Sequence, residues 1–70
     1  MDKYKLEYFM KLKNISKDDL CKAVGISKTA FYRKCRGISD FTREEILDIA
    51  KLLDLSGQDI LDIFFTLKVS

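Results

Sequence analysis

The sequence predicts an all-α fold, a single compact domain of five short helices, and three observations support this prediction. The 70 residues include no proline and only three glycines, so little in the chain interrupts a helix. Apolar residues recur at spacings of three and four in successive segments. Ser or Thr stands before four of these segments, where its hydroxyl is suited to cap the free amides of a first helical turn.

Length and composition limit the class of protein. With 70 residues, 47% of them hydrophobic, the chain is the size of one small globular domain. No apolar run approaches the ~18 residues of a membrane span, and the first residues lack the apolar core and cleavage site of a signal peptide. We therefore expect a cytoplasmic protein, with one domain over residues 1–66 and a short C-terminal tail over residues 67–70.

The capped helix starts share one pattern, in which an apolar residue precedes Ser or Thr and a second apolar residue follows four positions later. The four examples are Ile15-Ser16 to Leu20, Ile26-Ser27 to Phe31, Phe41-Thr42 to Ile46, and Leu55-Ser56 to Ile60. This pattern predicts an N-cap with a hydrophobic staple. Three of the starts also have an acid at the third helical position, Asp19, Glu45 and Asp59, which completes a capping box.

The expected helices follow in order along the chain. The first, residues 3–13, is expected to bury Leu6, Phe9 and Met10, and Asn14 ends it in a left-handed conformation. Two short helices over residues 17–36 are joined by a tight turn at Gly25. Their apolar faces are Leu20, Cys21 and Val24 in the one, and Ala30, Phe31 and Cys35 in the other.

Two further helices and a tail complete the chain. A helix over residues 43–53 presents Ile46, Ile49, Ala50 and Leu53, and a helix over residues 57–65 presents Ile60, Leu61 and Phe64. The tail alternates apolar and polar residues, which suits an extended strand. A small monomer has little interior left for its apolar residues, so we expect a dimer seam, with a frayed end as the alternative. The seam candidates are Phe64, Phe65, Leu67 and Val69.

Charge is distributed unevenly in this sequence. Residues 1–36 contain ten Lys or Arg and four Asp or Glu, a net +6, whereas residues 37–70 contain three and seven, a net −4. The helix within residues 27–36 concentrates the positive charge on and beside the side opposite Phe31, with no carboxylate of its own. This surface, the basic face, consists of Lys28, Thr29, Tyr32, Arg33 and Arg36. This pattern predicts a polyanionic partner for the first half of the chain.

The candidate residues for other chemistry are few. Two cysteines and no histidine fall short of the roughly four ligands of a structural zinc site, so we expect no metal and no cofactor. Cys21 and Cys35 lie on apolar faces, which favours buried reduced thiols over a disulfide. We expect no enzyme, because no nucleophile stands beside an evident base and the chain is too short to build a water-excluding pocket.

Residues 17–36 resemble the helix-turn-helix of phage repressor and Cro-like (XRE-type) transcriptional regulators. The resemblance rests on Lys17, Leu20, Cys21, Val24, Gly25, Ile26, Ser27, Phe31 and Gly37, and the later segments GISDFTREEI and LSGQDILDIFF extend it to roughly residues 5–66. Lys34 departs from the family, which often has an apolar residue there. The resemblance implies a lambda-repressor-like fold and a small regulator from a phage or prophage of a Gram-positive bacterium, acting on the host nucleoid.

The resemblance also implies a role for each polar residue of this region. Base contacts to a palindromic double-stranded operator, bound by a homodimer, are expected from Lys28, Thr29 and Arg33 in the major groove. Phosphate contacts are expected from Ser16, Lys17, Ser27, Tyr32, Lys34 and Arg36. No membrane and no small-molecule ligand are expected as partners.

Two alternatives remain open at this point. In the first alternative, the same fold serves as a protein-protein interaction module, an antirepressor or co-regulator, that binds through the acidic second half or the tail. The second concerns the first helix, where Tyr4, Tyr8 and Leu12 widen the apolar stripe. Its two extra aromatic residues, Tyr4 and Tyr8, belong either to the core, which we favour, or to a tyrosine collar near DNA.

Overall fold

The computed structural model describes residues 1–65, and these residues form five α-helices and no strand. The helices are α1 (Lys3–Leu12), α2 (Lys17–Val24), α3 (Lys28–Cys35), α4 (Arg43–Leu53) and α5 (Gly57–Phe64). The predicted all-α class is confirmed, and the helix boundaries agree with the prediction to within one residue. The expected strand and the Leu67 and Val69 part of the dimer seam lie outside the described residues.

The predicted caps account for the starts of α2 to α5. The hydroxyls of Ser16, Ser27, Thr42 and Ser56 each accept a hydrogen bond from the backbone N–H three residues later. The capping boxes of α2, α4 and α5 are complete, as predicted. The cap of α1 was not predicted from the sequence: the Asp2 carboxylate accepts from the Lys5 N–H at 3.1 Å.

The turn between α2 and α3 depends on Gly25, which has a φ of 81°. This left-handed conformation favours glycine because a Cβ there crowds the backbone. The Gly25 N–H donates to the Cys21 carbonyl at 2.8 Å, which ends α2 and turns the chain toward α3. Asn14 ends α1 with a φ of 56°, as predicted.

One buried cluster holds the helices together. Its members are Leu6, Met10, Leu20, Cys21, Phe31, Ile49, Leu53 and Ile63. The prediction for α5 was wrong in part, because Ile63 is fully buried whereas Leu61 is 53% exposed. Burial follows from how α5 packs beside α1 and α4, and the spacing of apolar residues alone allowed either face.

The preference for placing the two extra aromatic residues of α1 in the core was also wrong. Tyr4, Tyr8 and Leu12 are 73%, 59% and 61% exposed, on the side of α1 that faces away from Leu6 and Met10. Phe9 is half-buried against the core. The core is filled by one stripe of each helix, so the opposite stripe of α1 has no interior to enter.

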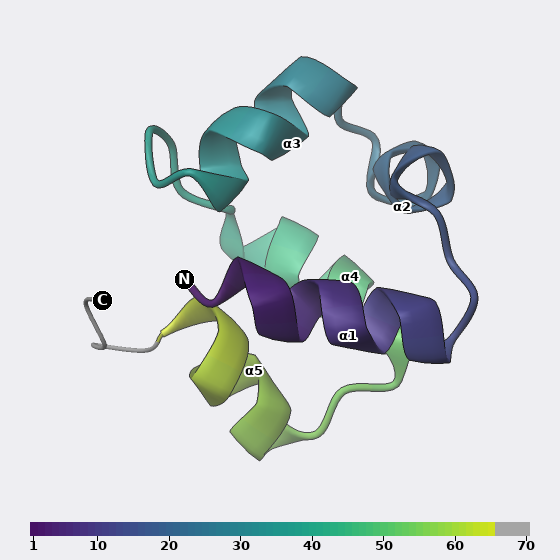
Figure 1. Ribbon diagram of the computed structural model, residues 1–70. Helices are drawn as coiled ribbons and strands as arrows, with labels where there is room; N and C mark the ends of the chain where they lie inside the picture. The colour runs from purple at the N-terminus through teal and green to yellow at the C-terminus, as the bar shows by residue number, and fades with distance from the viewer. Residues whose placement is uncertain (66–70) are drawn as a thin grey trace.

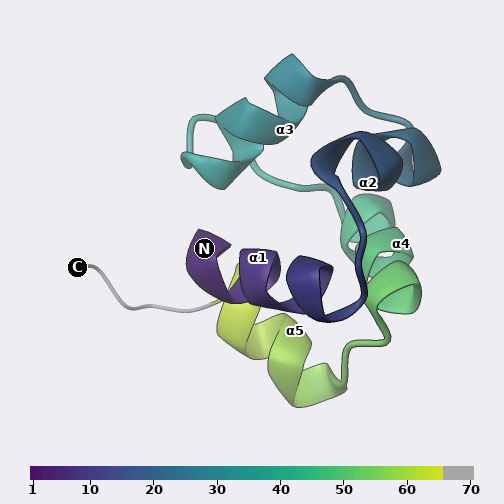
Figure 2. The same cartoon turned by 45° about the vertical axis from the view of Figure 1, so that its right-hand side comes forward.

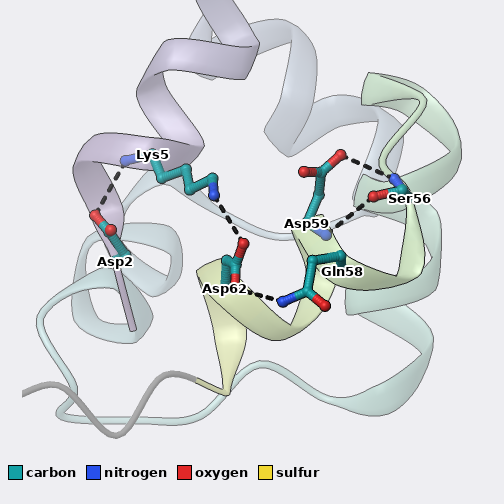
Figure 3. A network of polar contacts seen from close by, with 6 residues as sticks. All are labelled: Asp2, Lys5, Ser56, Gln58, Asp59 and Asp62. Atoms are coloured by element: carbon teal, nitrogen blue, oxygen red, sulfur yellow. Dashed lines mark hydrogen bonds and ion pairs between the residues drawn. The ribbon is translucent and has the colours of Figure 1, made fainter.

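The helices are arranged so that α3 and α5 lie at opposite ends of the molecule (Figure 1), and a view turned by 45° agrees (Figure 2). At the α5 end, the Asp2 N–H donates to the Ile63 carbonyl at 2.7 Å. Lys5 of α1 also pairs with Asp62 of α5 at 2.9 Å, and Gln58 donates to the same carboxylate (Figure 3). No helix within residues 1–65 is long and apolar enough to cross a bilayer.

Candidate nucleic-acid interface

The orientation of α3 is set by its inner face. Phe31 is buried, and its ring meets the Phe41 ring edge to face with centroids 6.1 Å apart. Ala30 and Cys35 are half-buried on the same side. With this side fixed against the domain, the side chains of the basic face are exposed. Figure 1 shows α3 at the end of the molecule opposite α5, with α2 beside it.

The three predicted base-reading residues lie exposed on α3. Thr29 and Arg33 have no side-chain hydrogen bond or ion pair to another residue within residues 1–65. The Lys28 ammonium differs, since it lies 2.8 Å from the Asp18 carboxylate of α2. All three side chains therefore lie on one exposed surface, and one of them, Lys28, forms an ion pair there with Asp18.

Asp18 corrects the expectation of a surface without carboxylates. Its side chain, 60% exposed, comes from the first turn of α2 and reaches the start of α3. Sequence analysis missed it because the acid and the lysine are ten residues apart and belong to different helices. A signal was present, however: Lys28 stands in the first turn of a helix, where a cation opposes the helix dipole.

The side of α3 that faces α1 is also cationic. The Lys17 ammonium lies over the Tyr32 ring, 5.2 Å from its centroid, and 3.9 Å from the Glu7 carboxylate. Beside them is a shallow cavity of about 520 Å³ between α1, α2 and α3, lined by Lys3, Leu6, Glu7, Lys17, Phe31, Tyr32, Cys35 and Arg36. The charged residues that line this cavity are mostly cations, so the cavity would attract a phosphate group.

The two N-caps near this surface differ in charge. The first turn of α2 carries Asp18 and Asp19, and the Asp19 carboxylate already accepts from the Ser16 N–H at 3.4 Å. The first turn of α3 carries no acid, and Ser27 caps it alone. An anion is therefore favoured more at the start of α3 than at the start of α2.

Lys34 does not lie on this outer surface. Its ammonium is 2.9 Å from the Glu45 carboxylate of α4 and 3.1 Å from the Asp40 carbonyl, and the side chain is only 12% exposed. This partly buried ion pair ties α3 to α4, so Lys34 is not placed to reach a phosphate. Cys35 is packed against the core, as its predicted inward role requires.

Hydrogen bonds to Glu45 stabilise its charged form. Burial alone would raise the pKa of this carboxyl, but the Thr42 N–H at 2.9 Å and the Lys34 ammonium outweigh it. The pKa of Glu45 is therefore held below its ordinary value, and the ion pair persists at neutral pH.

The cysteines offer no nucleophile. Both are free, and burial raises the pKa of the Cys35 thiol to about 11. Burial also raises the pKa of the Cys21 thiol. Within the described part of the chain, no group of three or more His, Cys, Asp or Glu side chains is placed to hold a metal ion.

Two helices joined by a left-handed glycine, with the second exposed and cationic, define a helix-turn-helix unit of the kind that enters the major groove of DNA. The sequence profile of the Cro/C1-type HTH DNA-binding domain matches residues 5–65. The chain belongs to this family. Comparisons with curated proteins and with solved structures gave no match.

Proposed function

We propose that this protein is a sequence-specific regulator of transcription, a Cro-like protein or small repressor of phage or prophage origin. The observation that carries the proposal is the exposed basic face of α3, held outward by the burial of Phe31 on the opposite side. Membership of a double-stranded DNA-binding family supplies the ligand class. The protein would act on the nucleoid of its host.

In the proposed complex, α3 reads base edges in the major groove, with Lys28 and Thr29 in its first turn and Arg33 in its last turn. Arg33 has a planar guanidinium suited to the two acceptors of guanine, and it lies exposed one turn after Thr29. Lys28 donates to guanine acceptors, and the Thr29 methyl group contacts thymine. Thr29 and Arg33 lie one turn apart on the same stripe of α3, and Lys28 precedes Thr29 at the start of the helix, so in the proposed complex the three residues would face neighbouring base pairs.

Residues around α3 would hold the docking register on the phosphates. Lys17, Tyr32 and Arg36 lie on the α1 side of the helix, where the cavity is mostly cationic. The Ser16 and Ser27 hydroxyl oxygens accept cap bonds, but each hydroxyl hydrogen remains a donor for a phosphate oxygen. Lys34 is left out of this set because it pairs with Glu45.

Replacing Arg33 tests the proposal directly. Selection of binding sites from random DNA at fixed salt should return a palindromic preference for the native protein. Arg33→Ala should weaken the preferred site by about 1–3 kcal/mol and relax the preference at one base pair of each half-site. Arg43→Ala removes the same charge from the first turn of α4 and should leave the base preference intact.

Two outcomes would contradict the proposal. A native protein that selects no sequence is not a sequence-specific regulator. A preference that survives Arg33→Ala unchanged would remove Arg33 from the base-reading set.

A single domain of this size covers on the order of 600–1,000 Å² on DNA, so we further propose that two copies bind together. Two exposed apolar side chains, Leu61 of α5 and Phe65 directly after this helix, supply the surface for this contact. Phe64 contributes less, because its ring packs edge to face on Phe41 with centroids 5.5 Å apart. An operator with two-fold symmetry and half-sites about 34 Å apart is the site that two such domains would have to span.

A further inference from the structure

One ion pair crosses the turn between the two helices of the helix-turn-helix. The Asp18 carboxylate oxygen lies 2.8 Å from the Lys28 nitrogen, a close ion pair, although both side chains are about 60% exposed. Asp18 is not needed to cap α2, because Ser16 and Asp19 complete that capping box between them. Its carboxylate is therefore free to pair with Lys28 of α3.

The position of Lys28 is unfavourable for the helix that carries it. Lys28 is the first residue of α3, where the free amides give the helix end a partial positive charge, and no acid of α3 lies in this turn. Asp18 brings the missing negative charge from α2. Its hydrogen bond raises the pKa of Lys28, and Lys28 in turn lowers the pKa of Asp18, so both groups are charged at neutral pH.

An acid on a DNA-binding surface weakens attraction to phosphates, so its presence there calls for a compensating role. A lysine without a partner is a flexible point charge that binds any phosphate oxygen within reach. The carboxylate of Asp18 biases the ammonium toward its own side of the surface, and it repels a phosphate that approaches in a shifted register. The pair thus disfavours binding in which Lys28 meets the backbone instead of a base.

We propose that Asp18 is a positioning residue that makes Lys28 read a base and reduces binding to arbitrary DNA. This inference rests on the proposed function, since it concerns the same DNA-binding surface. A residue of α2, Asp18, thus contributes to sequence selection, and it does so through Lys28.

The test compares the native protein with Asp18→Asn, which keeps the size of the side chain and removes its charge. Binding to the selected operator and to random duplex DNA is measured over a salt series. We expect Asp18→Asn to bind random DNA tighter, by about threefold to tenfold, with a salt slope steeper by about 0.9 because Lys28 is free to pair with a phosphate. The preference at the base pair read by Lys28 should fall, and Asp18→Glu should retain part of it.

Two controls separate this role from a general effect of charge. Asp48→Asn removes an exposed acid from α4 and should leave the base preference unchanged. In a Lys28→Ala background, Asp18→Asn should no longer alter the base preference, because the residue through which it acts is absent.

The outcomes distinguish the two proposals. If the native protein shows a sequence preference that Asp18→Asn leaves intact, this inference is overturned and the proposed function stands. If the native protein shows no preference, both are overturned. A change in preference that persists in the Lys28→Ala background would show that Asp18 does not act through Lys28, which also overturns the inference.

Discussion

At the scale of single residues, Gly25 and Gly57 contribute to stability in opposite ways. Gly25 has a φ of 81°, which an L side chain rarely adopts, and nothing lies within 4 Å of where its Cβ would be. If a side chain at position 25 destabilises the fold, the cause is therefore backbone strain and not a steric clash. Gly57 is the first residue of α5, has no such φ and has equally open space around it.

These two glycines give a matched pair of variants. Gly25→Ala should lower the free energy of unfolding by about 1 kcal/mol, because the left-handed backbone conformation is strained for alanine. Gly57→Ala should raise it by about 0.5 kcal/mol, because the unfolded chain loses freedom and the helix gains a better former. Urea unfolding followed by circular dichroism measures both, and a shift of the same sign for the two would contradict this account.

At the scale of helices, the Lys34 and Glu45 pair fixes how α3 sits against α4. The two side chains are 12% and 17% exposed, and the ammonium also lies 5.7 Å from the centre of the Phe41 ring. A partly buried polar contact therefore joins the two helices at this point. Because the pair holds one end of α3, it also helps to keep the basic face turned outward.

Removing the charge of Glu45 should show how much its contact with Lys34 contributes to the free energy of unfolding. At pH 7, Glu45→Gln should lower the free energy of unfolding by about 2 kcal/mol, since it leaves the Lys34 ammonium partly buried without its partner. The pKa of Glu45 is lowered by folding, so its contribution is present above the ordinary value of 4.5 and is lost as the pH falls through the folded value. The difference between native and variant should therefore shrink at pH 3.

The control for this variant is Asp59→Asn, which alters a capping box of α5 where no lysine within residues 1–65 pairs with the acid. It should cost less than Glu45→Gln at pH 7. An equal cost for the two variants would mean that the capping bond, rather than the ion pair, carries the effect.

Helix positions could be predicted from the sequence because their causes are local. Each cap depends on two residues that are three positions apart in the sequence. Ser16 with Asp19, and Thr42 with Glu45, were therefore sufficient to predict where α2 and α4 begin. Burial within a helix depends on its neighbours in space, and this is why Leu61 was misplaced.

The candidate site was predictable to a similar extent. The residues of the basic face follow from helical periodicity, once Phe31 is assigned to the interior. The Asp18 and Lys34 contacts join different helices, and only the packing of those helices brings their atoms together.

At the scale of the whole molecule, the two proposed surfaces lie far apart. The basic face belongs to α3 at one end, and α5 forms the opposite end (Figure 2). A second copy bound through α5 would leave α3 open to DNA. The uneven charge of the sequence agrees with this division, since the net positive half contains α3 and the net negative half contains α5.

The dimer proposal predicts a change in mass on DNA. Sedimentation over a range of protein concentrations should show two copies on one palindromic operator. Phe65→Ser should weaken this assembly at least tenfold, because it removes the apolar area that the contact would bury. Tyr4→Ser removes an exposed aromatic side chain from α1 and serves as the control. A single copy at every concentration, with and without DNA, would contradict the proposal.

The backbone bond from Asp2 to Ile63 places the first residues of the chain beside the end of α5. A short bridge of added residues could close the polypeptide into a ring there without moving any core side chain. The order in which the helices are connected is thus separable from the way they pack. A circularly permuted gene, opened in a surface turn, would encode the same set of interior contacts.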